Sequence, residues 1–183
     1  MKILLIHNFY QLPGGEDQVF AQETELLRGR GHQVLVYQAS NEQVKGQNPL
    51  VTVANTIWNQ RIHRELRELM HREKPDIVHV HNTFQVISPA IYYAANEEGI
   101  PVVRATPNGI SALISPNGHL DSTVPRRVAG VIDGFVPPAD PPTVFSRFGL
   151  WTCVGFGVFL GACGAAAKLT TKRIQRPVRA LQI

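Results

Sequence analysis

Cysteine is scarce in this sequence, with only Cys153 and Cys163 among 183 residues. Two cysteines cannot build a disulfide framework, and no histidine pair stands near them at zinc-finger spacing. The composition therefore predicts neither a disulfide-stapled domain nor a metal site. At 44% hydrophobic and 17% charged residues, it favours one ordinary folded domain over wholesale disorder.

The N-terminus lacks the features of a secretory signal. MKILLIHNFY carries one lysine and a short apolar run that ends at His7, with no small-residue cleavage site. We interpret this run as the first β-strand of a cytoplasmic protein.

Acidic residues are almost missing from the second part of the chain. Residues 1–104 contain 10 Lys/Arg and 11 Asp/Glu, whereas residues 105–183 contain 8 and 3, and no glutamate follows Glu98. A basic tail can bind nucleic acid or an anionic membrane. We favour a solvated, poorly ordered extension and expect no nucleic-acid partner.

Alternating strand and helix patterns fill residues 1–104. Apolar runs at residues 2–7, 32–38, 76–81 and 100–104 predict four strands. Helical patterns occupy the three intervals between them: from Glu16 to Gly29 or Gly31, from Asn55 or Thr56 to Glu73, and from Ser88 to Glu98. This order indicates an α/β fold, a Rossmann-like doubly wound parallel sheet with right-handed crossovers.

The regular pattern stops after Arg104. Residues 105–149 contain seven prolines and five glycines, and predict an irregular segment. Residues 150–167 are apolar throughout except for one threonine, and a basic stretch follows to Arg179. This run has the minimum length for a transmembrane helix, but its four glycines weaken a helix, so a buried or unstructured segment is the alternative. We therefore divide the chain into 1–104, 105–149 and 150–183.

The candidate binding residues lie where strands of such a sheet end. Ligands bind at the carboxyl ends of the strands, near the point where strand order reverses. Gly14 and Gly15 let a backbone approach a ligand beside a helix N-terminus, which favours an anion such as phosphate, although such pairs often serve only a tight turn. The pair lacks both the GxGxxG fingerprint and a GK[ST] P-loop, which disfavours nicotinamide chemistry and ATP hydrolysis.

A second polar cluster follows the third predicted strand. His79 and His81 alternate along that strand and share a face, with His81 nearer its carboxyl end. A strand histidine is more often a hydrogen-bonded core residue than a catalyst. With Asn82 and Thr83 beside it, His81 would present a cluster suited to sugar hydroxyls.

These motifs together resemble the N-terminal domain of glycosyltransferase family 4. The resemblance covers IHNFYQLPGGEDQVFAQETELLRGRGHQVLVY at 6–37 and KPDIVHVHNTFQVISPAIYYAANEEGIPVV at 74–103. It implies a retaining, nucleotide-sugar-dependent enzyme with two Rossmann-like domains, and no other cofactor. It also implies that this domain holds the sugar acceptor, that Gly14 and Gly15 pack near the donor phosphates, and that His81 and Asn82 border the cleft. Glu16 and Thr83, beside these residues, complete the candidate substrate-binding set.

Two departures from this resemblance follow residue 104. Pro107 stands where the family's TLHNYR-like motif has its active-site histidine, and Ser115 stands where a later motif has a cysteine. Proline offers no acid or base function, so we assign no catalytic residue. The pattern predicts a domain cut short after about residue 104, followed by out-of-frame sequence.

Three functional hypotheses remain. The first is a fragment of a glycosyltransferase, inactive alone because transfer needs a donor clamped between two domains; a separate chain would supply the donor domain. The second is a non-catalytic binding module, tethered to a membrane surface through residues 150–167. The third, an unrelated Rossmann-like nucleotide binder, is disfavoured by the spacing of the glycine loop.

Overall fold

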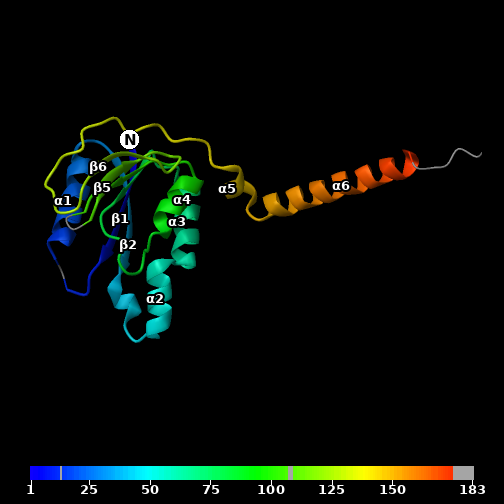
Figure 1. Ribbon diagram of the computed structural model, residues 1–183. Helices are drawn as coiled ribbons and strands as arrows, with labels where there is room; N and C mark the ends of the chain where they lie inside the picture. Colours follow the sequence, from blue (N-terminus) through cyan, green and yellow to red (C-terminus); the bar gives the residue numbers. More distant parts are fainter. Residues whose placement is uncertain (13, 107–108, 175–183) are drawn as a thin grey trace, which may run out of the picture. The chain divides into compact units, whose positions relative to one another are not determined.

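The computed structural model describes residues 1–12, 14–106 and 109–174 of the chain. They divide into two units, Met1–Thr143 and Val144–Ile183 (Figure 1). The first unit contains the sheet and the candidate site, and the second is helical in its described part.

Four parallel strands form the centre of the first unit. They are β1 (Lys2–Phe9), β2 (Gln33–Ser40), β3 (Ile77–Val80) and β4 (Val102–Arg104). β1 pairs with both β2 and β3, and β3 pairs with β4, all in parallel. The middle residues of β1, Leu4 to Ile6, are fully buried, as expected for a strand covered on both faces. The predicted α/β sheet is confirmed.

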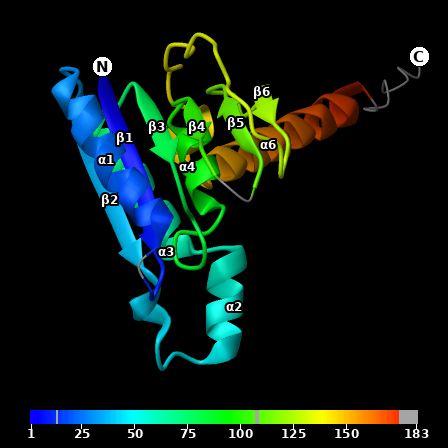
Figure 2. The same ribbon diagram turned by 90° about the vertical axis from the view of Figure 1, so that its left-hand side faces the viewer.

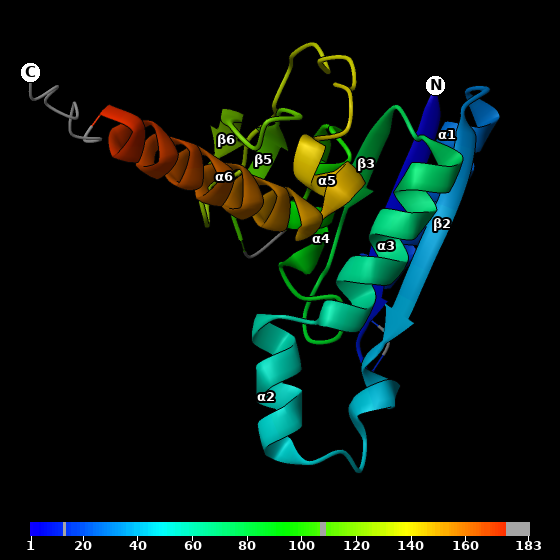
Figure 3. The same cartoon turned by 90° about the vertical axis from the view of Figure 1, so that its right-hand side faces the viewer.

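Helices cover both faces of the sheet, which confirms the doubly wound arrangement. Figure 2 views the face covered by α1 (Gly15–Gly29), and Figure 3 views the opposite face, covered by α3 (Gln60–Glu73) and α4 (Ala90–Glu97). Two separate cores result. The smaller lies under α1 and contains Ile3, Leu5, Phe20 and Ile77. The larger lies under α3 and α4 and includes Leu4, Ile6, Leu66, Met70, Val78, Val80, Ile87 and Ile91.

The connection from β2 to β3 contains more regular structure than the one helix that the sequence predicts there. It contains a 3₁₀ turn, η1 (Asn41–Val44), and a separate helix, α2 (Pro49–Ile57). The helix expected to begin at Asn55 or Thr56 begins only at Gln60. Asn59 sets this start, because its Oδ1 accepts from the Ile62 N–H at 3.2 Å while its Nδ2 donates to the Val86 carbonyl at 2.8 Å.

The sheet continues beyond Arg104, where the sequence predicts no strand. β5 (Ser111–Ile114) pairs antiparallel with β4, and β6 (Leu120–Val124) pairs antiparallel with β5. The prediction of an irregular segment is therefore wrong for these two strands. They are only four and five residues long, and β6 lies largely exposed, so neither carries the apolar run that marked the buried strands.

Residues 125–143 have no regular structure beyond a turn at their start, yet they return to the sheet unit. Asp140 N–H donates to the Gly99 carbonyl at 2.7 Å, and Thr143 N–H donates to the Glu97 carbonyl at 3.0 Å. Gly99 follows α4 with φ +69°, the left-handed conformation that is common just after the end of a helix. These contacts assign the irregular segment to the first unit.

The second unit contains α5 (Val144–Phe148) and α6 (Trp151–Ile174). Within the described residues, one stretch, Trp151–Lys168, is long and apolar enough to cross a membrane, and all of it is exposed. At 1.5 Å per residue its 18 residues span about 27 Å, close to the roughly 30 Å of a bilayer core. The apolar run at residues 150–167 therefore forms a helix with no protein core around it.

Candidate functional site

The switch point of the sheet lies between β1 and β3. The chain passes from β1 to β2 on one side, and then returns to place β3 on the other side of β1. The carboxyl ends of β1 and β3 therefore leave a crevice between their following loops. A cleft of about 780 Å³ opens there. It is lined by Tyr10, Gly14, Gly15, Glu16, Val19, Glu23, His81, Ala105 and Thr106.

This cleft brings together four of the six residues that the sequence marks for binding. Gly14, Gly15 and Glu16 come from the start of α1, and His81 follows β3. Asn82 and Thr83 are not among the lining residues. Pro107, at the position of the family's active-site histidine, lies outside the described residues.

The two glycines leave the cleft open without being needed for the turn. Gly14 is the N-cap of α1 with an extended backbone, φ −130°, and a Cβ at Gly14 or Gly15 would meet nothing within 4 Å. Larger residues could therefore adopt this backbone. The role of the glycine pair is therefore better explained by access of a ligand than by the needs of a tight turn.

Asp17 fixes the glycine loop to the first strand. Its Oδ2 accepts from the Gly14 N–H at 2.9 Å, and its Oδ1 lies 2.7 Å from Nε2 of the fully buried His7. The His7 ring is itself held between Phe9 and Phe20, with ring centroids 4.6 and 4.9 Å away. The loop is thus positioned by a buried polar contact at one wall of the cleft.

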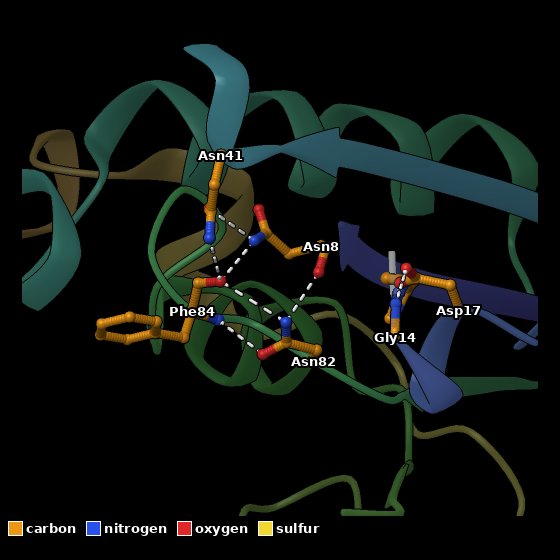
Figure 4. A network of polar contacts seen from close by, with 7 residues as sticks. Asn8, Gly14, Asp17, Asn41, Asn82 and Phe84 are labelled. Carbon is orange, nitrogen blue, oxygen red and sulfur yellow. Dashed lines mark hydrogen bonds and ion pairs between the residues drawn. The ribbon is translucent and has the colours of Figure 1, made fainter. Parts of the chain in front are cut away.

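Asn82 belongs to a network that shapes the loop after β3 (Figure 4). Its Nδ2 donates to the Asn8 carbonyl at 2.7 Å, and its Oδ1 accepts from the Phe84 N–H at 3.0 Å. Asn8 Nδ2 donates to Asn41 Oδ1 at 2.7 Å and also to the Phe84 carbonyl. At 8% exposure, Asn82 is committed to joining the end of β1 to the loop after β3.

Glu23 lines the cleft and joins two histidines, His79 of β3 and His81, which follows β3 and also lines the cleft. Its Oε1 lies 3.0 Å from His79 Nδ1, and its Oε2 lies 3.1 Å from His81 Nε2. The two imidazole rings stack with centroids 4.6 Å apart. Burial by itself would raise the pKa of Glu23, but the two imidazoles outweigh it and lower that pKa to about 2. The carboxylate is therefore ionised at neutral pH.

Sequence reasoning missed Tyr10, Val19, Glu23, Ala105 and Thr106 as cleft residues. Glu16, Val19 and Glu23 stand three and four residues apart, the spacing of one helix face, so the helical period could have found Glu23 from Glu16. Tyr10 follows β1 directly; burial, and the nearby Glu16 carboxylate, raise the pKa of its phenol. The phenol thus stays protonated at neutral pH.

Comparison with known proteins gives two different similarities. The model of the family described as Glycosyltransferase Family 4 matches residues 13–116, more than half of the chain and twelve residues beyond the expected boundary at 104. Curated relatives are apolipoprotein N-acyltransferases. That of Rickettsia bellii (strain RML369-C) is 42% identical over 69 residues, 36% of this chain and 14% of the relative.

Other relatives with the same name extend this second similarity. The protein of Bradyrhizobium diazoefficiens is 42% identical over 55 residues, 30% of this chain and 10% of the relative. That of Pseudomonas aeruginosa is 25% identical over 161 residues, 83% of this chain and 28% of the relative. The chain spans less than a third of the length of these relatives.

Proposed function

The chain belongs to glycosyltransferase family 4, and from this premise we propose that its first unit is an acceptor-side domain that binds sugar hydroxyls in the β1–β3 cleft. The observation that carries the proposal is the meeting of Gly14, Gly15, Glu16 and His81 at one cleft on the switch point. Carboxylate and imidazole groups accept hydrogen bonds from hydroxyls. Glu16, Glu23 and His81 offer such groups on the walls of this cleft.

We propose that the donor is a nucleotide-sugar whose diphosphate approaches the start of α1. Backbone N–H groups at a helix N-terminus favour anions, and the absence of side chains at Gly14 and Gly15 leaves that approach open. The carboxylate of Glu16 in the same turn would oppose a phosphate placed beside it. Donor affinity at this half-site is therefore expected to be weak.

The first unit by itself is proposed to bind and not to transfer. Retaining transfer requires the donor and acceptor to be held between two Rossmann-like domains. The described residues contain one sheet, and so supply one of the two domains that such transfer requires.

The test measures ligand binding to the full chain in detergent by saturation-transfer NMR. The probes are UDP-glucose, UDP-N-acetylglucosamine, GDP-mannose and free N-acetylglucosamine. We expect signals from at least one sugar, and their loss in Gly15→Leu, whose side chain would enter the cleft. Gly29→Leu is the matched control, because Gly29 ends the same helix and also has open space at its Cβ position.

Two outcomes would overturn the proposal. One is the absence of transfer signals from every probe. The other is binding that survives Gly15→Leu as well as it survives Gly29→Leu, because the ligand would then sit elsewhere.

A second candidate function is that of a binding module held at a membrane surface by α6. It is favoured by the exposure of an entire apolar helix segment, Trp151–Lys168, with Lys172 and Arg173 following it. Positive residues after an apolar span favour anchoring at an anionic surface. We expect the full chain to float with liposomes of phosphatidylethanolamine and phosphatidylglycerol, and the double change Val158→Lys and Leu160→Lys to abolish flotation. If the full chain stays in the soluble fraction when these liposomes float, this second candidate function is refuted.

The residues after 116 are proposed to derive from acyltransferase-like protein sequence. The similarity to the Pseudomonas aeruginosa protein covers 83% of the chain, so it necessarily extends past residue 116, where the family match ends. Out-of-frame sequence has no reason to resemble a curated protein, so this match weighs against that interpretation of residues 105–183. The acyl transfer named for the relatives is not part of the proposal, because the chain spans only a small share of them.

A further inference from the structure

Three side chains at and beside the cleft converge on one point. Glu23 comes from α1, and His79 and His81 come from one face of β3 and its carboxyl end. One ligand atom from each lies within 4.8 Å of the others. Among the described residues this is the only group of three His, Cys, Asp or Glu side chains with that geometry.

The spacing of these atoms fits a small cation bound between them. Bonds of about 2.1 Å at tetrahedral angles separate two ligand atoms by about 3.4 Å. The carboxylate oxygens of Glu23 lie 3.0 Å from His79 Nδ1 and 3.1 Å from His81 Nε2. A shift of a few tenths of an ångström in the flexible Glu23 side chain would therefore admit an ion.

Hydrogen bonding inside the cluster is incomplete. His81 is 8% exposed, and its Nε2 has no aligned hydrogen-bond partner among the described residues although it faces Glu23. A buried ring nitrogen without a partner is costly, and a cation would use the lone pair on His81 Nε2 together with that on His79 Nδ1, which faces Glu23 at 3.0 Å.

We propose that Glu23, His79 and His81 form a binding site for Zn²⁺ or a similar divalent transition-metal ion. Two imidazoles and one carboxylate favour zinc-like ions over Mg²⁺ and Ca²⁺, which prefer oxygen ligands. Because Glu23 and His81 also line the cleft, the fourth coordination position is open to water or a bound ligand. The sequence-based expectation of no metal rested on cysteine spacing, which does not apply to a histidine-carboxylate site.

This inference does not rest on the proposed sugar binding. Zinc binding and sugar binding have separate probes, so one can fail while the other holds. A cation held here would also partly offset the charge of Glu23 in the cleft.

The test is titration of the full chain in detergent with ZnCl₂ by calorimetry and with CoCl₂ by visible absorption. The background is Cys153→Ser with Cys163→Ser, so that no thiol competes. We expect one equivalent to bind, a tetrahedral Co²⁺ spectrum and a rise in Tm with Zn²⁺. Loss of even an outer-shell partner commonly weakens binding 10- to 100-fold, so Glu23→Gln, His79→Gln and His81→Gln should each weaken it by about 100-fold or more.

The matched control is His119→Gln. His119 also faces a carboxylate, with Nδ1 3.3 Å from Asp121 Oδ1, but this pair is exposed and has no third candidate ligand among the residues that the structure describes. Unchanged binding in this control is expected. Absence of a bound equivalent in the parent chain, or equal weakening in His119→Gln and the cluster variants, would overturn the proposal. If a histidine variant fails to fold, Glu23→Gln, which keeps the size of the side chain, decides the question.

Discussion

His7 Nε2 and Asp17 Oδ1 lie 2.7 Å apart and join the first strand to the first helix turn below the glycine loop. The histidine is fully buried, and the aspartate accepts a second hydrogen bond from Gly14 N–H. One carboxylate therefore caps α1 and satisfies a buried ring nitrogen. The contact holds the glycine loop in a position where a Cβ added at Gly14 or Gly15 would meet nothing within 4 Å.

Replacing Asp17 should therefore cost more than the loss of a helix cap. Asp17→Ala removes the Gly14 interaction, commonly worth about 1 kcal/mol, and leaves a buried histidine nitrogen without its partner, at about 1–3 kcal/mol. We expect the free energy of unfolding to fall by about 2–3 kcal/mol in urea denaturation. Glu25→Ala is the control, since this exposed carboxylate lies on the same helix. Equal losses in the two variants would contradict the bridging role of Asp17.

The parallel part of the fold could be predicted because its strands are buried on both faces. Leu4, Leu5 and Ile6 form a continuous apolar run, a signal that an amphipathic or exposed strand does not give. β6 has the sequence LDSTV and is half-exposed, and its pairing depends on a turn at Gly118, φ +84°. Antiparallel pairing with the neighbouring strand, and not an apolar pattern of their own, places β5 and β6 on the sheet.

The part of the candidate site that depends on backbone topology could be predicted from the sequence. The part that depends on contacts between side chains could not. Gly14, Gly15 and His81 follow from the rule that ligands bind at strand ends. Asn82 stands at the same end, yet its side chain is directed to Asn8 and Phe84. The helical period places Glu23 on the same helix face as Glu16, but only the structure brings its carboxylate to His79 and His81.

Gly99 should be far less tolerant of substitution than its conformation alone implies. Its φ of +69° disfavours any side chain, and a Cβ there would also clash with the backbone oxygen of Asp140. Gly31→Ala provides the matched control, because Gly31 has φ +82° with open space around it. We expect Gly31→Ala to lower the free energy of unfolding by about 1–2 kcal/mol, and Gly99→Ala to lower it by more than about 3 kcal/mol. Equal effects would show that residues 125–143 do not pack on α4 in solution.

Asn82 should behave as a structural residue in stability measurements. Asn82→Ala leaves the carbonyl of the buried Asn8 and the Phe84 N–H without their side-chain partners. We expect a loss of about 2–3 kcal/mol in chemical denaturation. Thr83→Ala, at the next position, is the control and should lose less than about 1 kcal/mol. An Asn82→Ala variant that is stable but binds sugar poorly would instead show that Asn82 acts in ligand binding.

Tyr37 should make the stability of the protein fall in alkali. Burial, and then the hydrogen bond to the Glu65 carboxylate at 2.9 Å, raise the pKa of this phenol above its ordinary value of 10.0. A pKa that is higher in the folded state gives stability that is complete below pH 10 and is lost as the pH rises above it. Because Tyr37→Phe removes the hydrogen bond, it should lower the free energy of unfolding by about 1 kcal/mol at neutral pH. The free energy of unfolding of this variant should also fall less steeply between neutral pH and strong alkali. Urea denaturation across that range, with Tyr93→Phe at an exposed position of α4 as the control, measures both effects. An alkaline decline that is as steep in Tyr37→Phe as in Tyr93→Phe would exclude Tyr37 as its cause.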